Sequence, residues 1–316
     1  MFGAQGANDQ RKPGARLGAG RGRPSGTGPG IPEAEQQRRE FEFTPADFER
    51  VRALIYKHAG ISLGPIKQEL VYGRLVRRVR ALGYGSFAQY LAQLEGGDET
   101  EWETFVNSLT TNLTSFFRDA HHFDILLRHL HQAKSRPLRI WCAAAASGEE
   151  AYSIAITACE AFDTLTPPVS IIASDIDTQV LAIAEQGVYP IDRVEKLSAK
   201  RLRRFFLKGR GAQAGYARVR PELQQLVRFT RINLLDARLP LRGPFDAIFC
   251  RNVMIYFDKA TQYAILKKFA PLLCGDGLLF SGPSENFLNA GDLFRPLGRT
   301  VYARADRNPS AAMAKT

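Results

Sequence analysis

The sequence lacks any long hydrophobic run, because no stretch of its 316 residues approaches the roughly 20 consecutive apolar residues of a membrane span. Its first residues include charges and glycines but no apolar segment of a secretory signal peptide. Cysteine is also scarce, with Cys142, Cys159, Cys250 and Cys274. These four have neither CxxC spacing nor histidines at metal-ligand intervals. We therefore expect a cytoplasmic protein without membrane insertion, with reduced, buried cysteines and no metal.

Acidic residues are fewer than basic ones. The chain has 43 Lys and Arg against 32 Asp and Glu, a formal net charge of +11. Residues 1–40 hold seven bases and four acids, which leaves +8 of the +11 on the rest of the chain. This excess predicts an acidic partner, but charge alone does not choose among nucleic acid, an anionic membrane and an acidic protein surface.

Composition divides the chain into three parts. Residues 1–40 contain nine glycines and four prolines, with no aromatic residue after Phe2, so we expect a disordered basic tail. Residues 41–130 have helical periodicity, and Thr44 before Pro45 is typical of a helix start. This range predicts a small all-α domain. Residues 131–316 predict a larger α/β domain.

One helix of the first domain is strongly basic. From Ile66 to Leu82 the apolar residues recur on one face, while Lys67, Arg74, Arg77 and Arg78 lie largely on another. We expect this basic face to point to solvent, where it is either simply solvated or docks an acidic partner.

From Leu138 onward, short apolar segments alternate with helical ones, which predicts a mostly parallel sheet covered on both sides. The expected strands are Leu138–Ala143, Val169–Ser174, Phe245–Cys250 and Gly277–Ser281. The expected helices are roughly Gly148–Phe162, Asp177–Gln186 and Lys259–Leu273. The alternation breaks at about 187–231. There a basic helix-like run is followed by a glycine-rich turn, Gly209–Gly215, and then by two strand-like segments, Tyr216–Arg220 and Leu226–Ile232. This pattern predicts a small antiparallel β insertion.

Ligands of open α/β sheets bind beyond the carboxyl ends of the strands. After the first expected strand comes a run of small residues that ends in Glu149 and Glu150, and after the second comes Asp175. A carboxylate at that distance can accept hydrogen bonds from a ribose diol. The two glutamates would repel a pyrophosphate but suit a cationic ligand. The alternatives are that the small residues only pack and that the glutamates only complement the helix dipole.

Taken in order, these segments closely resemble the CheR family of chemotaxis receptor methyltransferases over about residues 41–303. The matching segments are Leu109–Arg118 (LTTNLTSFFR), Ala143–Glu150 (AAAASGEE), Ser174–Thr178 (SDIDT), Asn233–Leu235 (NLL), Gly243–Phe257 (GPFDAIFCRNVMIYF) and Ser284–Asn286 (SEN). The resemblance implies a Rossmann-like S-adenosylmethionine-dependent methyltransferase domain preceded by the all-α domain. It also implies the family's reaction, which forms glutamate methyl esters on chemoreceptors and S-adenosylhomocysteine.

The resemblance further implies the site. The positions that match cofactor-surrounding residues of similar proteins are Asn112, Thr114, Arg118, Glu150, Asp175, Asn233, Leu234, Arg251 and Asn252. Similar proteins usually have serine where Ala146 stands and proline where Ala151 stands, so one hydroxyl contact and some helix rigidity are expected to be missing. The choice of Glu150 over Glu149 follows the alignment alone, because adjacent helical residues point about 100° apart.

The acceptor carboxylate would already be ionised at neutral pH, so the reaction needs orientation rather than a general base. Arg118 can engage a carboxylate and Tyr256 can donate one directional hydrogen bond, and both are our candidate catalytic residues. By default, however, a Tyr between Ile255 and Phe257 is a core residue and an Arg after two phenylalanines lies on the surface.

Two other functions remain open from the residues alone. A basic surface suits a nucleic-acid methyltransferase, but the Asn/Asp-Pro-Pro-aromatic motif of enzymes that methylate flipped bases is absent from the sequence. A scaffold that only binds partners would not need the full set of charged site residues. We therefore expect the receptor's helical bundle as the partner, and no nucleic acid. The β insertion is expected to hold a C-terminal receptor peptide or merely to cover the pocket.

Overall fold

The computed structural model describes residues 39–133 and 136–306. The expected disordered tail, 1–40, therefore lies almost wholly outside the described residues. Those from Phe43 onward form one compact unit. Among the described residues, no helix is long and apolar enough to cross a bilayer.

The amino-terminal part of this unit is helical, as expected. Its elements are α2 (Pro45–Ala59), η1 (Pro65–Lys67), α3 (Gln68–Ala81), α4 (Phe87–Glu95) and α5 (Glu99–Leu109). The expected helix start is confirmed as a capping box, in which Thr44 accepts from the Asp47 N–H and Asp47 accepts from the Thr44 N–H. Val51, Leu75 and Phe105 are among the apolar side chains buried between these helices.

The expectation of a solvent-directed basic face over η1 and α3 is wrong for two of its four residues. Arg78 donates through Nε and Nη2 to the buried carboxylate of Glu101, which also accepts from the Tyr90 hydroxyl. Arg74 donates to the carbonyl oxygens of Leu109 and Thr110, each at 2.8 Å. Lys67 and Arg77 remain exposed. Sequence periodicity missed this because the partners lie 23 to 36 residues away on α5 and after it.

The remaining chain is built on a seven-stranded sheet with the order β6-β2-β1-β7-β8-β10-β9. The strands are β1 (Leu138–Cys142), β2 (Val169–Asp175), β6 (Val227–Arg231), β7 (Phe245–Phe249), β8 (Leu273–Phe280), β9 (Phe294–Gly298) and β10 (Val301–Arg304). The first five are parallel, and β10 and β9 extend the sheet antiparallel. This is the expected Rossmann-like architecture with an antiparallel edge that was not expected.

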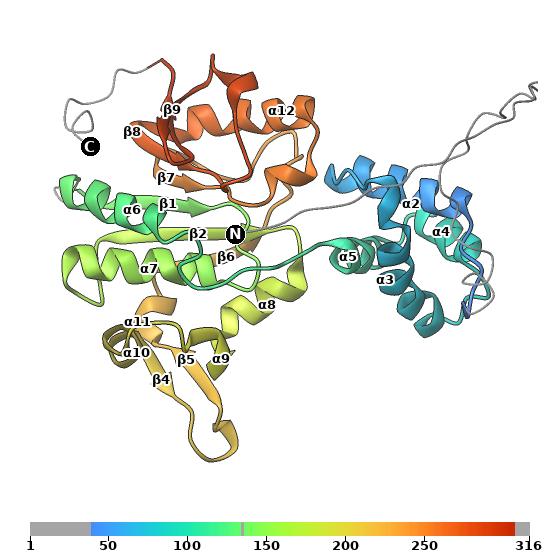
Figure 1. The fold of residues 1–316 in the computed structure, drawn as a ribbon, viewed down its shortest axis with the longest axis horizontal. Helices are drawn as coiled ribbons and strands as arrows, with labels where there is room; N and C mark the ends of the chain where they lie inside the picture. Colours follow the sequence, from blue (N-terminus) through green and yellow to red (C-terminus); the bar gives the residue numbers. More distant parts are fainter. Residues whose placement is uncertain (1–38, 134–135, 307–316) are drawn as a thin grey trace, which may run out of the picture. The chain divides into compact units, whose positions relative to one another are not determined.

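Helices cover both faces of the sheet (Figure 1). The helices are α6 (His121–Gln132), α7 (Glu149–Phe162), α8 (Thr178–Gln186) and α12 (Lys259–Phe269), with short turns η3 (Met254–Tyr256), η4 (Ala270–Leu272) and η5 (Leu288–Ala290). Apolar residues of α6 and α7 pack on one face and those of α12 on the other. Most of helix α6 falls inside the range expected for the all-α domain, 41–130, yet its buried side chains belong to the core of the sheet.

The β insertion forms a separate three-stranded antiparallel sheet with the order β3-β5-β4. Its elements are β3 (Val188–Pro190), α9 (Ile191–Val194), α10 (Ala199–Phe205), β4 (Phe206–Lys208), η2 (Gly211–Gln213), β5 (Tyr216–Val219) and α11 (Pro221–Gln224). The strand-like segment Leu226–Ile232 does not belong to it, because β6 pairs with β2 in the main sheet. The hairpin partner of β5 is β4. The sequence did not indicate β4, because its three residues directly follow a helical pattern.

Candidate functional site

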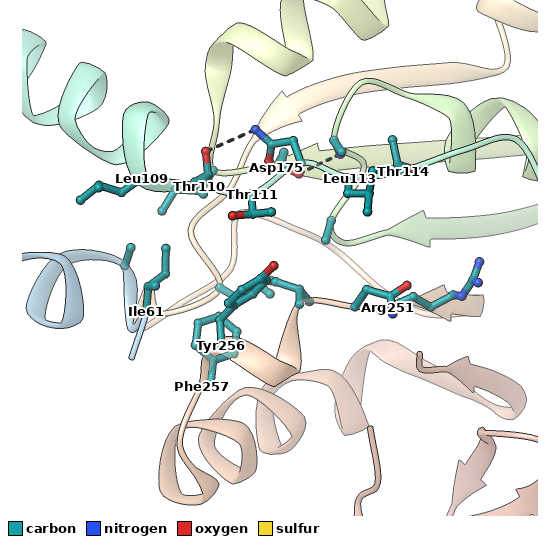
Figure 2. A pocket seen from close by; sticks show the side chains of 18 of the residues that line it. Ile61, Leu109, Thr110, Thr111, Leu113, Thr114, Asp175, Arg251, Tyr256 and Phe257 are labelled. Atoms are coloured by element: carbon teal, nitrogen blue, oxygen red, sulfur yellow. Dashed lines mark hydrogen bonds between the residues drawn. The ribbon is translucent and has the colours of Figure 1, made fainter. Parts of the chain in front are cut away.

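A pocket of about 310 Å³ lies where the carboxyl ends of the central strands meet the helical part (Figure 2). Every residue that the sequence proposed for the site lines it: Asn112, Thr114, Arg118, Glu150, Asp175, Asn233, Leu234, Arg251, Asn252 and Tyr256. These residues come from widely separated parts of the chain. Seven of them lie at or after the ends of β1, β2, β6 and β7, which are parallel and end at the same edge of the sheet. Asn112, Thr114 and Arg118 lie in the segment between α5 and α6.

The wall after β1 is built from backbone. Ala146 has a φ of 46°, a conformation that costs a non-glycine residue energy, and its N–H donates to Asp175 Oδ2 at 2.8 Å. The other oxygen, Oδ1, accepts from the Asp177 N–H at 3.1 Å. Burial raises the pKa of the Asp175 carboxyl, although these N–H bonds act in the opposite direction. The carboxylate still has acceptor capacity for a ligand, because two oxygens offer about four sites.

A buried ion cluster closes one end of the pocket. Arg251 Nη1 donates to Glu150 Oε2 at 2.7 Å, and Nη2 donates to the Arg118 carbonyl at 2.6 Å and to Asp119 Oδ2 at 2.5 Å. Burial raises the pKa of Glu150, while the neighbouring Arg251 guanidinium acts to lower it. Two carboxylates around one guanidinium favour a cationic ligand group at this end.

The two adjacent glutamates at the start of α7 point in different directions. Glu150 lines the pocket, whereas Glu149 is fully buried beneath the insertion, where Arg193 and the Ser147 hydroxyl donate to it. Arg193 also donates to the Thr114 carbonyl. The choice of Glu150 as the inward-facing acid therefore agrees with the structure, and Glu149 has a role in holding the insertion.

Two predicted cofactor residues use their side chains within the protein. Asn112 Nδ2 donates to Asp177 Oδ2 at 2.7 Å, and the same oxygen accepts from the Thr110 hydroxyl. Asn233 Nδ2 donates to the His58 carbonyl at the end of α2, at 2.8 Å. Both residues thus hold pocket walls in place, and any contact of theirs with a ligand remains a prediction.

The two candidate catalytic residues occupy different walls. Arg118 donates from Nη1 to the Leu113 carbonyl at 2.9 Å, which uses one N–H of a group that has five. Tyr256 lies in η3, and Figure 2 shows its ring pointing into the pocket toward the wall formed by Thr111 and Leu113. The interpretation of Tyr256 as an ordinary core residue is therefore wrong, since it is only half-buried and lines the pocket.

Sequence reasoning missed the part of the pocket that the helical domain supplies. Ile61 to Gly64, Lys67, Leu70 and Arg74 all line it. The helical domain is bonded directly to the turn that carries Tyr256, because the Ser62 N–H donates to the Tyr256 carbonyl at 2.8 Å. Gly60, with a φ of 70°, allows the close approach, because a Cβ there would lie 3.0 Å from Leu235. The only signal in the sequence was the short break between the two expected helices.

Comparison with known proteins gives the same assignment over nearly all of the described residues. Residues 112–303 match the family described as CheR methyltransferase, SAM binding domain, and residues 46–110 match the CheR methyltransferase all-alpha domain. The chain is 54% identical over 268 residues to chemotaxis protein methyltransferase 2 of Pseudomonas aeruginosa, covering 84% of this chain and 95% of the relative. It is 50% identical over 269 residues to the chemotaxis protein methyltransferase of Salmonella typhimurium, covering 85% and 93%.

The pocket suits S-adenosylmethionine on its own chemistry. Its volume is at the lower end of the range for small-molecule sites. The carboxylates of Glu150 and Asp175 are placed at different segments of the pocket wall, one in an ion cluster and one among backbone N–H groups. The first suits an ammonium and the second a ribose diol.

Replacing Asp175 tests this assignment. Asp175→Ala should weaken S-adenosylmethionine binding about tenfold or more, because the ribose hydroxyls lose a charged acceptor. Isothermal titration calorimetry on the purified variant measures the change. Asp163→Ala is the control, since Asp163 is an exposed carboxylate that pairs with Arg204 at the end of α7. Equal affinity in the two variants would place Asp175 outside the ligand's contacts.

Proposed function

The chain belongs to the CheR family, in which it is an S-adenosylmethionine-dependent methyltransferase acting on glutamate side chains of chemoreceptors, and we propose that Arg118 and Tyr256 orient the acceptor. The observation that supports this role is their position on two walls of one pocket. S-adenosylmethionine supplies an activated methyl group on a sulfonium. The protein's task is to place one oxygen of the acceptor carboxylate in line behind that methyl group.

The two residues would divide this task. Arg118 neutralises and aligns the acceptor carboxylate with its planar guanidinium group. Because the acceptor is already ionised, no proton has to be removed from it. The methyl ester forms as the bond to sulfur breaks, and the sulfonium charge and the carboxylate charge are lost together. A low-dielectric pocket favours this step, since charge disappears as the reaction proceeds.

The Tyr256 hydroxyl differs from those of two buried tyrosines, Tyr152 in α7 and Tyr189 in β3. Those of Tyr152 and Tyr189 donate to the backbone carbonyls of Ala184 and Ser147, at 2.8 and 2.7 Å. Among the described residues, none forms a hydrogen bond with the hydroxyl of Tyr256. An uncommitted donor that points into a pocket is available to a ligand, which supports a role next to the reacting groups.

Tyr256→Phe deletes only this hydroxyl. We expect kcat to fall about tenfold to hundredfold, because one preorganised donor is lost, with little change in cofactor affinity. Initial rates of labelled methyl transfer to receptor, together with calorimetry, measure the two quantities. Tyr263→Phe is a matched control, since it removes a hydroxyl that bonds Asp292 on the surface of α12. Turnover at the parent level in Tyr256→Phe would contradict the role.

For the receptor's cytoplasmic helical bundle we propose a docking face on η1 and α3. Of the four basic residues that the sequence suggested, Lys67 and Arg77 support this proposal because both are exposed. Lys67 also lines the pocket, so a partner held there would lie next to the opening. Opposite charges mainly accelerate the encounter of two surfaces.

Charge reversal separates docking from folding on this helix. Lys67→Glu with Arg77→Glu should lower kcat/KM and flatten its dependence on salt while leaving the melting temperature nearly unchanged. Arg78→Glu is the contrast, because it would place a carboxylate beside buried Glu101 and reduce the free energy of unfolding by about 3 to 5 kcal/mol. An unaltered salt profile in the double variant would show that this face is only solvated.

The β insertion is our proposed site for a C-terminal receptor peptide. Residues 187–224, which form the insertion, contain ten Lys and Arg but only three Asp and Glu. Three of the arginines pair with acids outside the insertion, at Glu149, Glu160 and Asp163. Most of the others, including Arg218, are exposed. This concentration of positive charge suits a terminal carboxylate and acidic side chains.

The edges of the small sheet favour one side for such a peptide. The outer strands are β3 and β4, and Pro190 in β3 has no N–H to offer. Leu207 and Lys208 in β4 are exposed. Peptide addition at β4 would use main-chain hydrogen bonds for affinity and these side chains for selectivity. A weak tether would still raise the local receptor concentration toward the millimolar range.

The compact turn that joins β4 to β5 provides the test. The turn requires glycine at position 209, because a Cβ added there would lie 1.9 Å from the Gln213 carbonyl oxygen. We expect a fluorescent peptide from the C-terminus of the organism's receptors to bind the parent protein, and to bind at least about tenfold more weakly when a longer flexible loop replaces Gly211–Gly215. The same peptide with an amidated C-terminus is the control. Equal binding by both proteins, or by neither, would contradict the tether.

A further inference from the structure

A buried carboxylate lies behind the pocket wall formed by Asn252 and Tyr256. Glu285 is 5% exposed and follows β8. Its Oε1 accepts from the Met254 N–H at 2.8 Å, and its Oε2 accepts from the N–H groups of Asn252 at 3.0 Å and Gly282 at 2.5 Å. One side chain thus binds three backbone donors of two loops, and both of its oxygens are occupied.

The backbone that Glu285 holds is in an uncommon conformation. Asn252 has a φ of 57°, which costs energy unless the surroundings determine it. Gly282 permits the close packing of the two loops, since a Cβ there would lie 2.6 Å from Asn252 Nδ2 and 2.9 Å from Glu285 Oε2. The conformation of Asn252 is therefore maintained by contacts from a loop 30 residues later.

The carbonyl groups of the same turn are held from two other sides. Gln262 in α12 donates through Nε2 to the carbonyl oxygens of Met254 and Phe257, at 2.8 and 3.1 Å. Ser62 of the helical domain donates its N–H to the Tyr256 carbonyl at 2.8 Å. The turn that presents Tyr256 is thus fixed through its backbone while the Tyr256 side chain remains free to face the pocket.

We propose that Glu285 is a positioning residue, which sets Asn252 against the cofactor and Tyr256 against the acceptor by holding the backbone between them. The part that concerns Tyr256 rests on the role proposed above. Glutamine cannot replace glutamate here, although it has nearly the same shape. Both oxygens accept N–H bonds, so an amide NH₂ in either place would point a donor at a donor.

Glu285→Gln is the diagnostic variant of the full chain. We expect kcat to fall about tenfold, because a small displacement of an orienting group is sufficient for such a loss. In a Tyr256→Phe background the same substitution should change kcat less than about twofold, since the group that it displaces is already gone. A parallel cycle uses Asn252→Ala and measures the dissociation constant of S-adenosylmethionine. In the Asn252→Ala background, Glu285→Gln should change this constant less than it does in the parent protein.

A matched control distinguishes positioning from loss of stability. Asp47→Ala also removes a buried carboxylate that accepts a backbone N–H, but in the capping box of α2. It should lower the melting temperature and leave kcat and cofactor affinity at the parent values, whereas Glu285→Gln should change all three. Rates are compared below both melting temperatures.

The outcomes separate this inference from the proposed function. If Tyr256→Phe alone retains full turnover, the role of Tyr256 is wrong, and the Asn252 cycle still decides whether Glu285 positions the cofactor wall. If Glu285→Gln keeps parental turnover and affinity, or if its effects simply multiply with the second substitution in both cycles, Glu285 only stabilises the fold and the inference is overturned.

Discussion

The buried guanidinium of Arg251 joins three segments that the rest of the site depends on. It lies just after β7, binds Glu150 at the start of α7, and binds Asp119 and the Arg118 carbonyl in the segment that leaves the helical domain. Its side chain is only 1% exposed, so its charge is balanced by these partners rather than by solvent. Removing one member would leave an uncompensated charge in the interior, which is costly. The sheet, the start of α7 and the segment before α6 are therefore held in one arrangement.

Side chains, rather than regular secondary structure, satisfy the backbone around the pocket. Asp175 binds the strained Ala146, Asp177 begins α8 and holds Asn112, and Glu285 binds the loop that follows Arg251. The loops at the carboxyl edge of a parallel sheet leave strand pairing, so their N–H and C=O groups need such partners. The same acidic side chains thus give the loops one conformation and shape the ligand site, which is a condition for orienting two reactants.

The helical domain and the β insertion both contact this site. From the first, the His58 carbonyl binds Asn233 and the Ser62 N–H binds the carbonyl of the turn at Tyr256. From the β insertion, the Tyr189 hydroxyl donates to the Ser147 carbonyl in the turn between β1 and α7, and Arg193 binds Glu149. The surfaces proposed to meet the receptor are thus parts of the same bonded structure as the pocket.

The sequence alone determined the α/β fold class and the four central strands, because local periodicity is a property of neighbouring residues. The family resemblance of its motifs pointed to ten of the residues that line the pocket, but not to those that the helical domain supplies. The sequence also indicated that the pocket would be acidic. Only the tertiary structure decided which glutamate faces inward, since Arg193 binds Glu149 from 44 residues away. Likewise, Arg78 turned out to be a structural partner of Glu101, and β6 to be a strand of the main sheet. These assignments depend on which distant segments meet in the folded chain, and burial and pairing between such segments leave no periodic signal in the sequence.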